Sequence, residues 1–293
     1  VALNTSLLNV SEVIFLPTFN VAEVRRNLPR ATIMMGVPTF YSRLLGDSEF
    51  SASDCASVRL FISGSAPLTQ EVFKAFEERT GRRILERYGM SEAGMIASNP
   101  LDGERIAGTV GYALPGVDLR ITADGRALSP GQTGVVEVRG PNVFKGYWRM
   151  PEKTAEEFRD GDWFATGDIG SLSHDGRLTL SGRAKDLVIV GGYNVYPKEI
   201  EEVLDALPEI AESAVIGAPH PDMGEGVVAI LVPARGSPTA PPLSAEELTI
   251  AVSTLARFKQ PRKFIWLDVL PRNTMGKVQK QALREIYSRL FAQ

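Results

Sequence analysis

Along the first third of the chain, stretches with the hydrophobic pattern of a strand alternate with stretches that have the pattern of a helix. Apolar runs at 13–16, 31–36 and 58–63 predict short buried strands. Apolar residues at helical spacing predict a helix over 21–28 and another that opens at Pro38. Because strands and helices alternate, we expect an α/β fold with a covered, mixed sheet.

The same pattern continues to residue 107. Thr69 is a favourable helix cap, and Leu68 and Phe73 stand where a hydrophobic staple needs them. A strand over 83–88 then runs into a glycine turn.

From residue 108 the pattern changes to short strands separated by glycines. The strands are predicted over 118–122, 134–139 and 177–180. We expect this β-rich subdomain to be a distorted barrel.

Beyond Lys185 the order is strand, helix, strand, strand, helix, strand. Pro197 opens one helix, where its missing N–H costs nothing, and Ser244 opens the next as part of a capping box. The proline-rich composition of residues 233–242 predicts a surface loop. The predicted organisation is a large domain over 1–183, made of 1–107 and 108–183, and a small mobile α/β lid domain over 184–293.

Composition sets further limits. The 293 residues allow two domains of roughly 100–200 residues each. A net charge of −3 favours no nucleic-acid partner, and no apolar run approaches the ~20 residues of a membrane span. The single cysteine, Cys55, rules out an internal disulfide and a cysteine metal cluster. With only two histidines, we expect no zinc site. Because the first residue is Val1, we expect a fragment, from a cytoplasmic or mitochondrial protein of unknown oligomeric state.

Four short stretches could carry chemistry. The first, Gly64-Ser65-Ala66-Pro67, follows a strand, where α/β sheets bind ligands, although a plain turn explains it too. The second, 87–92, offers the Glu92 carboxylate to Mg²⁺ and the Ser91 hydroxyl to a phosphate; a helix cap is the alternative.

The third stretch is Thr166-Gly167-Asp168. Its carboxylate could accept both hydroxyls of a ribose, or close an Asx turn. The fourth is 271–280, in which Lys277 could reach a ligand or be an ordinary solvated lysine.

Together these stretches resemble the adenylate-forming superfamily of acyl-CoA synthetases, amino-acid-activating domains and luciferases. The motifs that carry the likeness are Tyr88-Gly89-Met90-Ser91-Glu92, with Ser where Thr is usual, Thr166-Gly167-Asp168, Gly182-Arg183-Ala184-Lys185-Asp186, 191–201 and 271–280. Within the superfamily, 35–41, 60–68, 86–90, 140–154 and 273–280 look most like malonyl-CoA synthetases.

The resemblance implies an ATP-dependent ligase that uses Mg²⁺ and coenzyme A and forms malonyl-CoA, or methylmalonyl-CoA, through an acyl-adenylate. It implies catalytic roles for Lys277 and Glu92, with Glu92 also holding the metal. The nucleotide-binding residues that it implies are Gly64, Ser65, Ala66, Pro67, Glu86, Arg87, Tyr88, Gly89, Met90, Ser91, Asp168, Arg183 and Lys277. The expected coenzyme A contacts are Gly191, Gly192 and Tyr193, and the expected hinge is Lys185.

The position of Arg87 in the family faces the acyl pocket. A buried arginine there needs an anion, and the distal carboxylate of a dicarboxylate supplies one. Arg43, Gly94 and Met95 are the other expected substrate contacts. The alternative is that Arg87 pairs with a protein carboxylate such as Glu86 or Glu92.

One motif of the family is not in this sequence. The Thr/Ser/Gly-rich phosphate loop with its lysine lies upstream in the family, so the resemblance covers the second part of a full enzyme. An activating domain for amino acids, another small-acid ligase and an inactive nucleotide-binding piece therefore remain as alternatives.

Overall fold

The computed structural model describes residues 2–234, 242–273 and 276–292. Most of the predicted loop over 233–242 and two residues of the 271–280 motif lie outside these described residues. The described chain forms two compact units. Unit 1 comprises 1–166 and 170–180, and unit 2 comprises 167–169 and 181–293. The predicted division after residue 183 stays a prediction.

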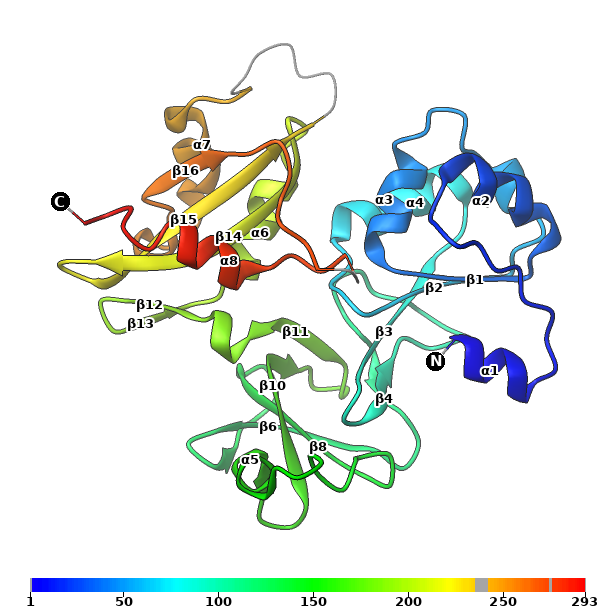
Figure 1. Cartoon of the computed structure of the whole chain (residues 1–293), viewed down its shortest axis with the longest axis horizontal. Coiled ribbons are helices and arrows are strands. Elements are labelled where there is room, and N and C mark those ends of the chain that lie inside the picture. The colour runs from blue at the N-terminus through cyan, green and yellow to red at the C-terminus, as the bar shows by residue number, and fades with distance from the viewer. Residues whose placement is uncertain (1, 235–241, 274–275, 293) are drawn as a thin grey trace. The chain divides into compact units, whose positions relative to one another are not determined.

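The first sheet of unit 1 has five strands in sequence order (Figure 1). Its first three strands run parallel, and the last two pair antiparallel, so the sheet is mixed as predicted. The strands are β1 (Ile33–Gly36), β2 (Leu60–Ser63), β3 (Ile84–Met90), β4 (Gly94–Ser98) and β5 (Tyr112–Ala113).

Helices α2, α3 and α4 lie together beside this sheet (Figure 1). Their apolar faces and the sheet share one core, in which Tyr41, Phe61 and Phe76 are almost fully buried. Thr69 caps α4 as predicted, since its side chain accepts a hydrogen bond from Val72 N. The helices are α1 (Ala2–Leu8), α2 (Val21–Asn27), α3 (Pro38–Leu45) and α4 (Gln70–Thr80), with 3₁₀ turns at Leu28–Arg30 and Ala52–Cys55.

The predicted strand over 13–16 is wrong. These residues form no strand, and Phe15 is 79% exposed. A short apolar run becomes a strand only where a neighbouring strand pairs with it, which the run itself does not reveal.

The second sheet has six strands in the order β11-β10-β8-β6-β7, with β9 paired to β10. Within the described residues this sheet has an edge strand at each end, β11 and β7, so the predicted distorted barrel is wrong and the sheet is open. The elements are β6 (Asp118–Ala123), β7 (Arg126–Ala127), β8 (Gly134–Arg139), α5 (Pro151–Glu157), β9 (Phe158–Arg159), β10 (Trp163–Leu172) and β11 (Leu178–Arg183). Side chains of β4, β6 and β8 share its core with Phe164.

Unit 2 is built on a third sheet, in which β13, β12, β15 and β14 are antiparallel neighbours and β16 pairs parallel with β15. The strands are β12 (Val188–Val190), β13 (Tyr193–Val195), β14 (Ile210–His220), β15 (Gly224–Pro233) and β16 (Lys263–Trp266). The helices are α6 (Pro197–Asp205), α7 (Ala245–Ala251) and α8 (Lys280–Ile286), with 3₁₀ turns at Ala184–Asp186, Val252–Thr254 and Arg257–Lys259.

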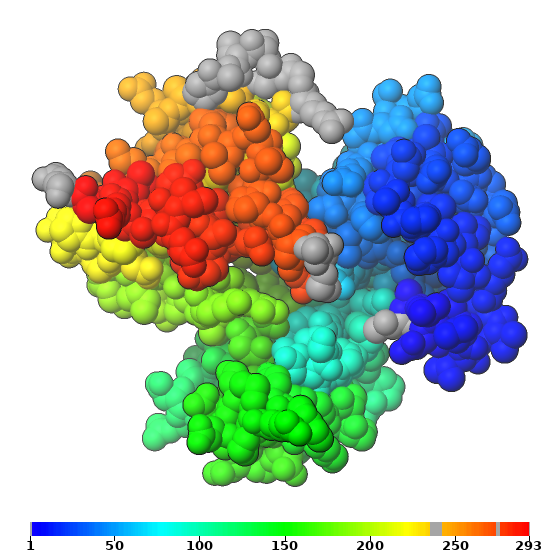
Figure 2. Space-filling view, viewed as in Figure 1, coloured from blue at the N-terminus to red at the C-terminus, as the bar shows by residue number. Residues whose placement is uncertain are grey.

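Two cores hold the helices of unit 2 on this sheet. Ile200 and Leu204 of α6 are fully buried in one, and Leu283 of α8 is fully buried in the other. The C-terminal segment with α8, red in Figure 2, lies at the surface of the unit. The predicted capping box is confirmed, because the Ser244 and Glu247 side chains each accept from the other residue's backbone.

The α/β fold class is confirmed, with three sheets rather than a closed barrel. No helix within the described residues is long and apolar enough to span a membrane.

Candidate active site

The carboxyl ends of β1 and β2 and the middle of β3 meet in register, which brings the first two chemical stretches together. Ser63 pairs with Gly36 on one side and with Glu86 on the other. The chain leaves β2 at Gly64, and a Cβ placed on Gly64 would lie 3.4 Å from Arg87 Cγ. The predicted adenine loop, Gly64 to Pro67, therefore lies beside Arg87.

Glu86 accepts a hydrogen bond from the backbone directly after this loop. Its side chain is 5% exposed, and Oε1 accepts a hydrogen bond of 3.1 Å from Leu68 N. Ser65 has a φ of +70°, a conformation that costs energy in a residue other than glycine and persists only where the surroundings impose it. The geometry gives Glu86 the role of fixing the loop backbone, through a contact 18 residues away in sequence.

Arg87 is half-buried and contacts few polar groups. Its Nη2 lies 4.0 Å from Met35 Sδ. Burial lowers the pKa of Arg87, against the opposing influence of Tyr41 nearby. The side chain stays charged, because the normal pKa of arginine is so high.

Neither carboxylate that the sequence offered as a protein partner for Arg87 takes that role. Glu86 accepts from Leu68, and Glu92 accepts from Tyr147 Oη at 3.2 Å. No ion pair found among the described residues involves Arg87. Within the described residues, Arg87 is therefore a half-buried cation without a carboxylate partner.

Strands β3 and β4 form a tight hairpin, and its turn carries Ser91 and Glu92. Gly89 pairs with Met95 and Met90 pairs with Gly94, with a bulge after Tyr88. A Cβ on Gly89 would stand 2.2 Å from Gly94 O, so only glycine fits there. Tyr88 is buried in the core, whereas Ser91 is exposed and the Glu92 side chain is partly exposed. Ser91 lies in a hairpin turn, so the helix-cap alternative is wrong.

Arg43 is placed differently from Arg87. It is exposed on α3, with its guanidinium 5.8 Å from the centroid of the Phe19 ring. Its predicted substrate contact has no support from the contacts of the described residues.

Sequence reasoning gave Tyr147 no role, although its phenol contacts Glu92. Burial, the charge of Glu92 and the hydrogen bond to it raise the pKa of Tyr147, so the phenol is a neutral donor at neutral pH. The two residues are 55 positions apart, and no local pattern links them.

In unit 2, Asp168 and Arg183, which the resemblance names as nucleotide-binding residues, form an ion pair. Arg183 Nε lies 3.2 Å from Asp168 Oδ1, and the Asp168 side chain is 10% exposed. The alternative of an Asx turn is wrong, because Gly167, at a φ of +72°, and Asp168 lie inside the continuous strand β10. Thr166 of the same motif donates its hydroxyl to Val136 O at 2.8 Å, which is a structural contact.

The predicted hinge and coenzyme A stretch form a 3₁₀ turn followed by a β-hairpin. Lys185 is exposed in the turn Ala184–Asp186. Gly191 and Gly192 have φ values of +56° and +86°, and a two-residue hairpin turn of type I′ requires positive φ at both positions. A Cβ on either glycine would meet nothing within 4 Å. Tyr193, which is 61% exposed, stacks on Phe258.

The backbone of Lys277 is hydrogen-bonded to Asn273. Its N–H donates to Asn273 Oδ1 at 2.9 Å, and its carbonyl accepts from Asn273 N at 3.0 Å. Arg272 donates to Gly276 O at 2.6 Å and forms an ion pair with Glu212 on β14. These contacts fix the backbone that carries Lys277.

The donor set limits how a metal could be held. No cluster of three or more His, Cys, Asp or Glu side chains suited to a metal occurs in the parts of the chain that the structure describes. Mg²⁺ in nucleotide enzymes is commonly bound by one or two carboxylates plus substrate phosphates. The single carboxylate of Glu92 fits that mode and does not fit a metal site made of protein groups alone.

Two protein families match parts of this chain. Residues 1–148 match the family described as AMP-binding enzyme, and residues 199–277 match the AMP-binding enzyme C-terminal domain. A probable CoA ligase, CCL8, of Humulus lupulus is 42% identical over 94% of this chain and 50% of its own length. A malonate–CoA ligase of Arabidopsis thaliana is 38% identical over 92% of this chain and 49% of its own length.

A crystal structure of ATP-bound MatB from Rhodopseudomonas palustris has a similar fold. Its TM-score is 0.95 at 50% identity, with 99% of this chain and 57% of that chain covered. This chain spans about half the length of the relatives that it matches. Ligases named for long-chain fatty acids and for indoleacetate have only slightly lower identities, so similarity alone does not select the acid.

Proposed function

The chain belongs to the family of AMP-binding enzymes, and on that basis we propose that the full-length protein is an ATP-dependent ligase that forms malonyl-CoA. Methylmalonate, which carries the same pair of carboxylates, is the second expected substrate. A cytoplasmic or mitochondrial location stays a prediction.

The reaction has two steps. One carboxylate oxygen of malonate attacks the α-phosphorus of ATP, and the bond to the β-phosphate oxygen breaks, which releases pyrophosphate. The thiol of coenzyme A then attacks the acyl carbon, loses its proton, and displaces AMP. Because negative charge gathers at phosphorus in the first step, preorganised positive charge is the main catalytic requirement.

The candidate residues have separate roles in this scheme. Gly64 to Pro67 line the adenine with backbone, Asp168 and Arg183 hold the ribose, and Ser91 donates to the α-phosphate. Lys277 stabilises the acyl and phosphate oxygens during adenylation. Glu92 would hold Mg²⁺ that enters with ATP, and the ion would add positive charge at the phosphates.

The second step uses other groups. Gly191 and Gly192 border the pantetheine arm, where a missing Cβ leaves room for a narrow thiol chain. Rotation of the lid about Lys185 moves Lys277 away from the reacting atoms and brings this hairpin to them, as hinge motions do in other enzymes.

The observation that carries the choice of malonate is the half-buried Arg87 without a protein carboxylate among the described residues. Burying an unpaired charge is costly, and a bidentate pair with the distal carboxylate of malonate removes that cost. The Arabidopsis malonate–CoA ligase among the relatives supports the same choice.

The test is Arg87→Met in the full-length protein, because methionine keeps the length of the side chain and removes its charge. We expect kcat/KM for malonate to fall about 100-fold, the loss of roughly two hydrogen bonds between charged groups. The value for acetate, which lacks a distal carboxylate, is expected to change less than about threefold.

Arg83→Met is the matched control, since Arg83 is exposed and forms a surface ion pair with Glu77. Arg83→Met is expected to leave kcat/KM unchanged for both malonate and acetate. Equal losses for malonate and acetate in Arg87→Met would show that Arg87 does not read the second carboxylate.

A further inference from the structure

Residues 140–147, which connect β8 to the segment before α5, form a loop that braces the hairpin turn at Glu92. Phe144 N donates to Glu92 O at 2.7 Å, and Asn142 Nδ2 donates to Ala93 O at 2.7 Å. The third contact, from Tyr147 Oη to Glu92 Oε1, joins the loop to the carboxylate itself. Two of the bonds fix the turn backbone and one fixes the side chain.

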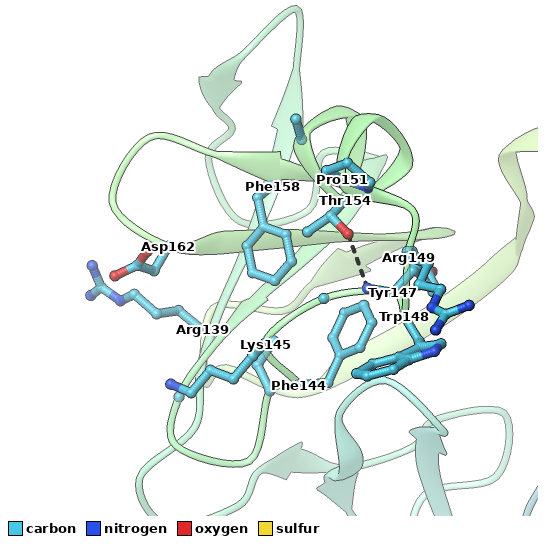
Figure 3. Close-up of a pocket in the computed structure, with 14 residues that line it drawn as sticks. Arg139, Phe144, Lys145, Tyr147, Trp148, Arg149, Pro151, Thr154, Phe158 and Asp162 are labelled. Carbon is cyan, nitrogen blue, oxygen red and sulfur yellow. Dashed lines mark hydrogen bonds between the residues drawn. The ribbon is translucent and has the colours of Figure 1, made fainter.

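The loop is itself held against α5, which gives the phenol a defined position. Tyr147 N donates to Thr154 Oγ1 at 2.9 Å, and Figure 3 shows this bond as a dashed line. A Cβ on Gly146 would lie 2.7 Å from Thr154 Cγ2, so glycine is what allows the loop to come this close. Thr154 also donates to Met150 O at 2.9 Å and so belongs to the helix start.

Aromatic packing orients the ring of Tyr147. Its centroid lies 4.8 Å from that of Phe144, with the two rings at 73°. Phe144 in turn packs against Phe158 and Phe164, the latter at 5.3 Å and almost fully buried. The tyrosine therefore has little freedom to leave Glu92, since edge-to-face contacts of this kind favour one ring orientation.

Tyr147 also lines an open hollow of about 850 Å³ on unit 1. Figure 3 shows Lys145 and Trp148 around the same loop. These side chains are exposed, and nothing in their contacts commits the hollow to an occupant. The contact with Glu92 is the feature of this loop that has a chemical consequence.

We propose that Tyr147 is a positioning residue that holds the Glu92 carboxylate in the orientation needed to bind metal-bearing ATP. The proposal rests on the nucleotide-binding role given to Glu92 above. The phenol donates to Oε1 and so limits rotation of the carboxylate, which leaves Oε2 with a fixed direction. Preorganised ligands bind more tightly because less freedom is lost on binding.

The experiment is calorimetric titration of ATP into the full-length protein without any acid, once with Mg²⁺ and once with EDTA. Tyr147→Phe removes the hydroxyl and keeps the ring. We expect ATP with Mg²⁺ to bind about tenfold more weakly, as loss of one hydrogen bond to a charged group predicts, and ATP without metal to bind as in the unaltered protein.

A double-mutant cycle with Glu92→Gln separates positioning from a general structural effect. If Tyr147 acts through Glu92, Tyr147→Phe has no further effect on metal-dependent binding once Glu92 is replaced. Tyr112→Phe is the matched control, because Tyr112 Oη also bonds to a carboxylate, that of Asp175, at 2.8 Å. It is expected to leave ATP affinity unchanged.

Three results would overturn the proposal. They are equal losses with and without Mg²⁺, additive losses in the double variant, and ATP binding by the unaltered protein that does not depend on Mg²⁺. Since no acid is present, the outcome does not depend on malonate being the substrate, and failure of one proposal can be told from failure of the other.

Discussion

Replacing Gly89 by alanine should separate hairpin geometry from general stability. The new Cβ would stand 2.2 Å from Gly94 O and 3.1 Å from Met95 Cα. Both are backbone atoms of β4, so no side-chain rotation relieves the clash. Ordinary contact begins at 3.4 Å, and the two strands must therefore separate by about 1 Å at this point.

This displacement has two measurable consequences. Forced overpacking of this kind costs about 1–3 kcal/mol, which thermal unfolding of the full-length protein will report as a lower Tm. The hairpin also carries Arg87 and Glu92, and a 1 Å misplacement of catalytic groups can cost about 100-fold in activity. We expect that loss in kcat/KM for malonate.

Gly81→Ala is the control. Gly81 ends α4 at a φ of +67°, and its new Cβ would meet nothing within 4 Å. Alanine there should cost about 1 kcal/mol through the left-handed backbone alone and leave activity unchanged. Unchanged stability and activity in Gly89→Ala would refute a role of the hairpin geometry, and so would an equal loss of activity in Gly81→Ala.

The remaining predictions concern the lid and compare the two half-reactions. Lys277→Ala should lower ATP–pyrophosphate exchange by about 100-fold or more, since it removes a charge from the adenylation step, and spare thioester formation from preformed acyl-adenylate. Lys185→Pro should do the reverse, because proline fixes φ near −65° and restricts the proposed hinge. Single-turnover assays of each half-reaction measure both, and a variant that loses the two steps equally contradicts its assigned role.

Features set by neighbouring residues could be predicted from the sequence. The caps at Thr69 and Ser244 and the start of α3 at Pro38 are found as expected, because each depends on side chains within one helical turn. The prediction of a strand over 13–16 was wrong for the opposite reason, since a strand needs a pairing strand that is distant in sequence.

The same division holds in the candidate site. The turn with Ser91 and Glu92 and the candidates Asp168 and Arg183 came from motifs that the family resemblance supplied. The pairing of β3 with β4 and the ion pair between Asp168 and Arg183 were not predicted. The support of the adenine loop by Glu86 and the contact of Tyr147 with Glu92 could not be predicted. Each joins segments that only the folded sheets bring together.

The most direct test of the central claim is ATP–pyrophosphate exchange by the full-length protein with a panel of acids. The panel comprises malonate, methylmalonate, acetate, a long-chain fatty acid and an amino acid. We expect malonate to support the fastest exchange, with methylmalonate next and acetate at least about 100-fold lower in kcat/KM, the factor expected from the Arg87 contact. Exchange that is as fast with acetate or a fatty acid as with malonate would contradict it.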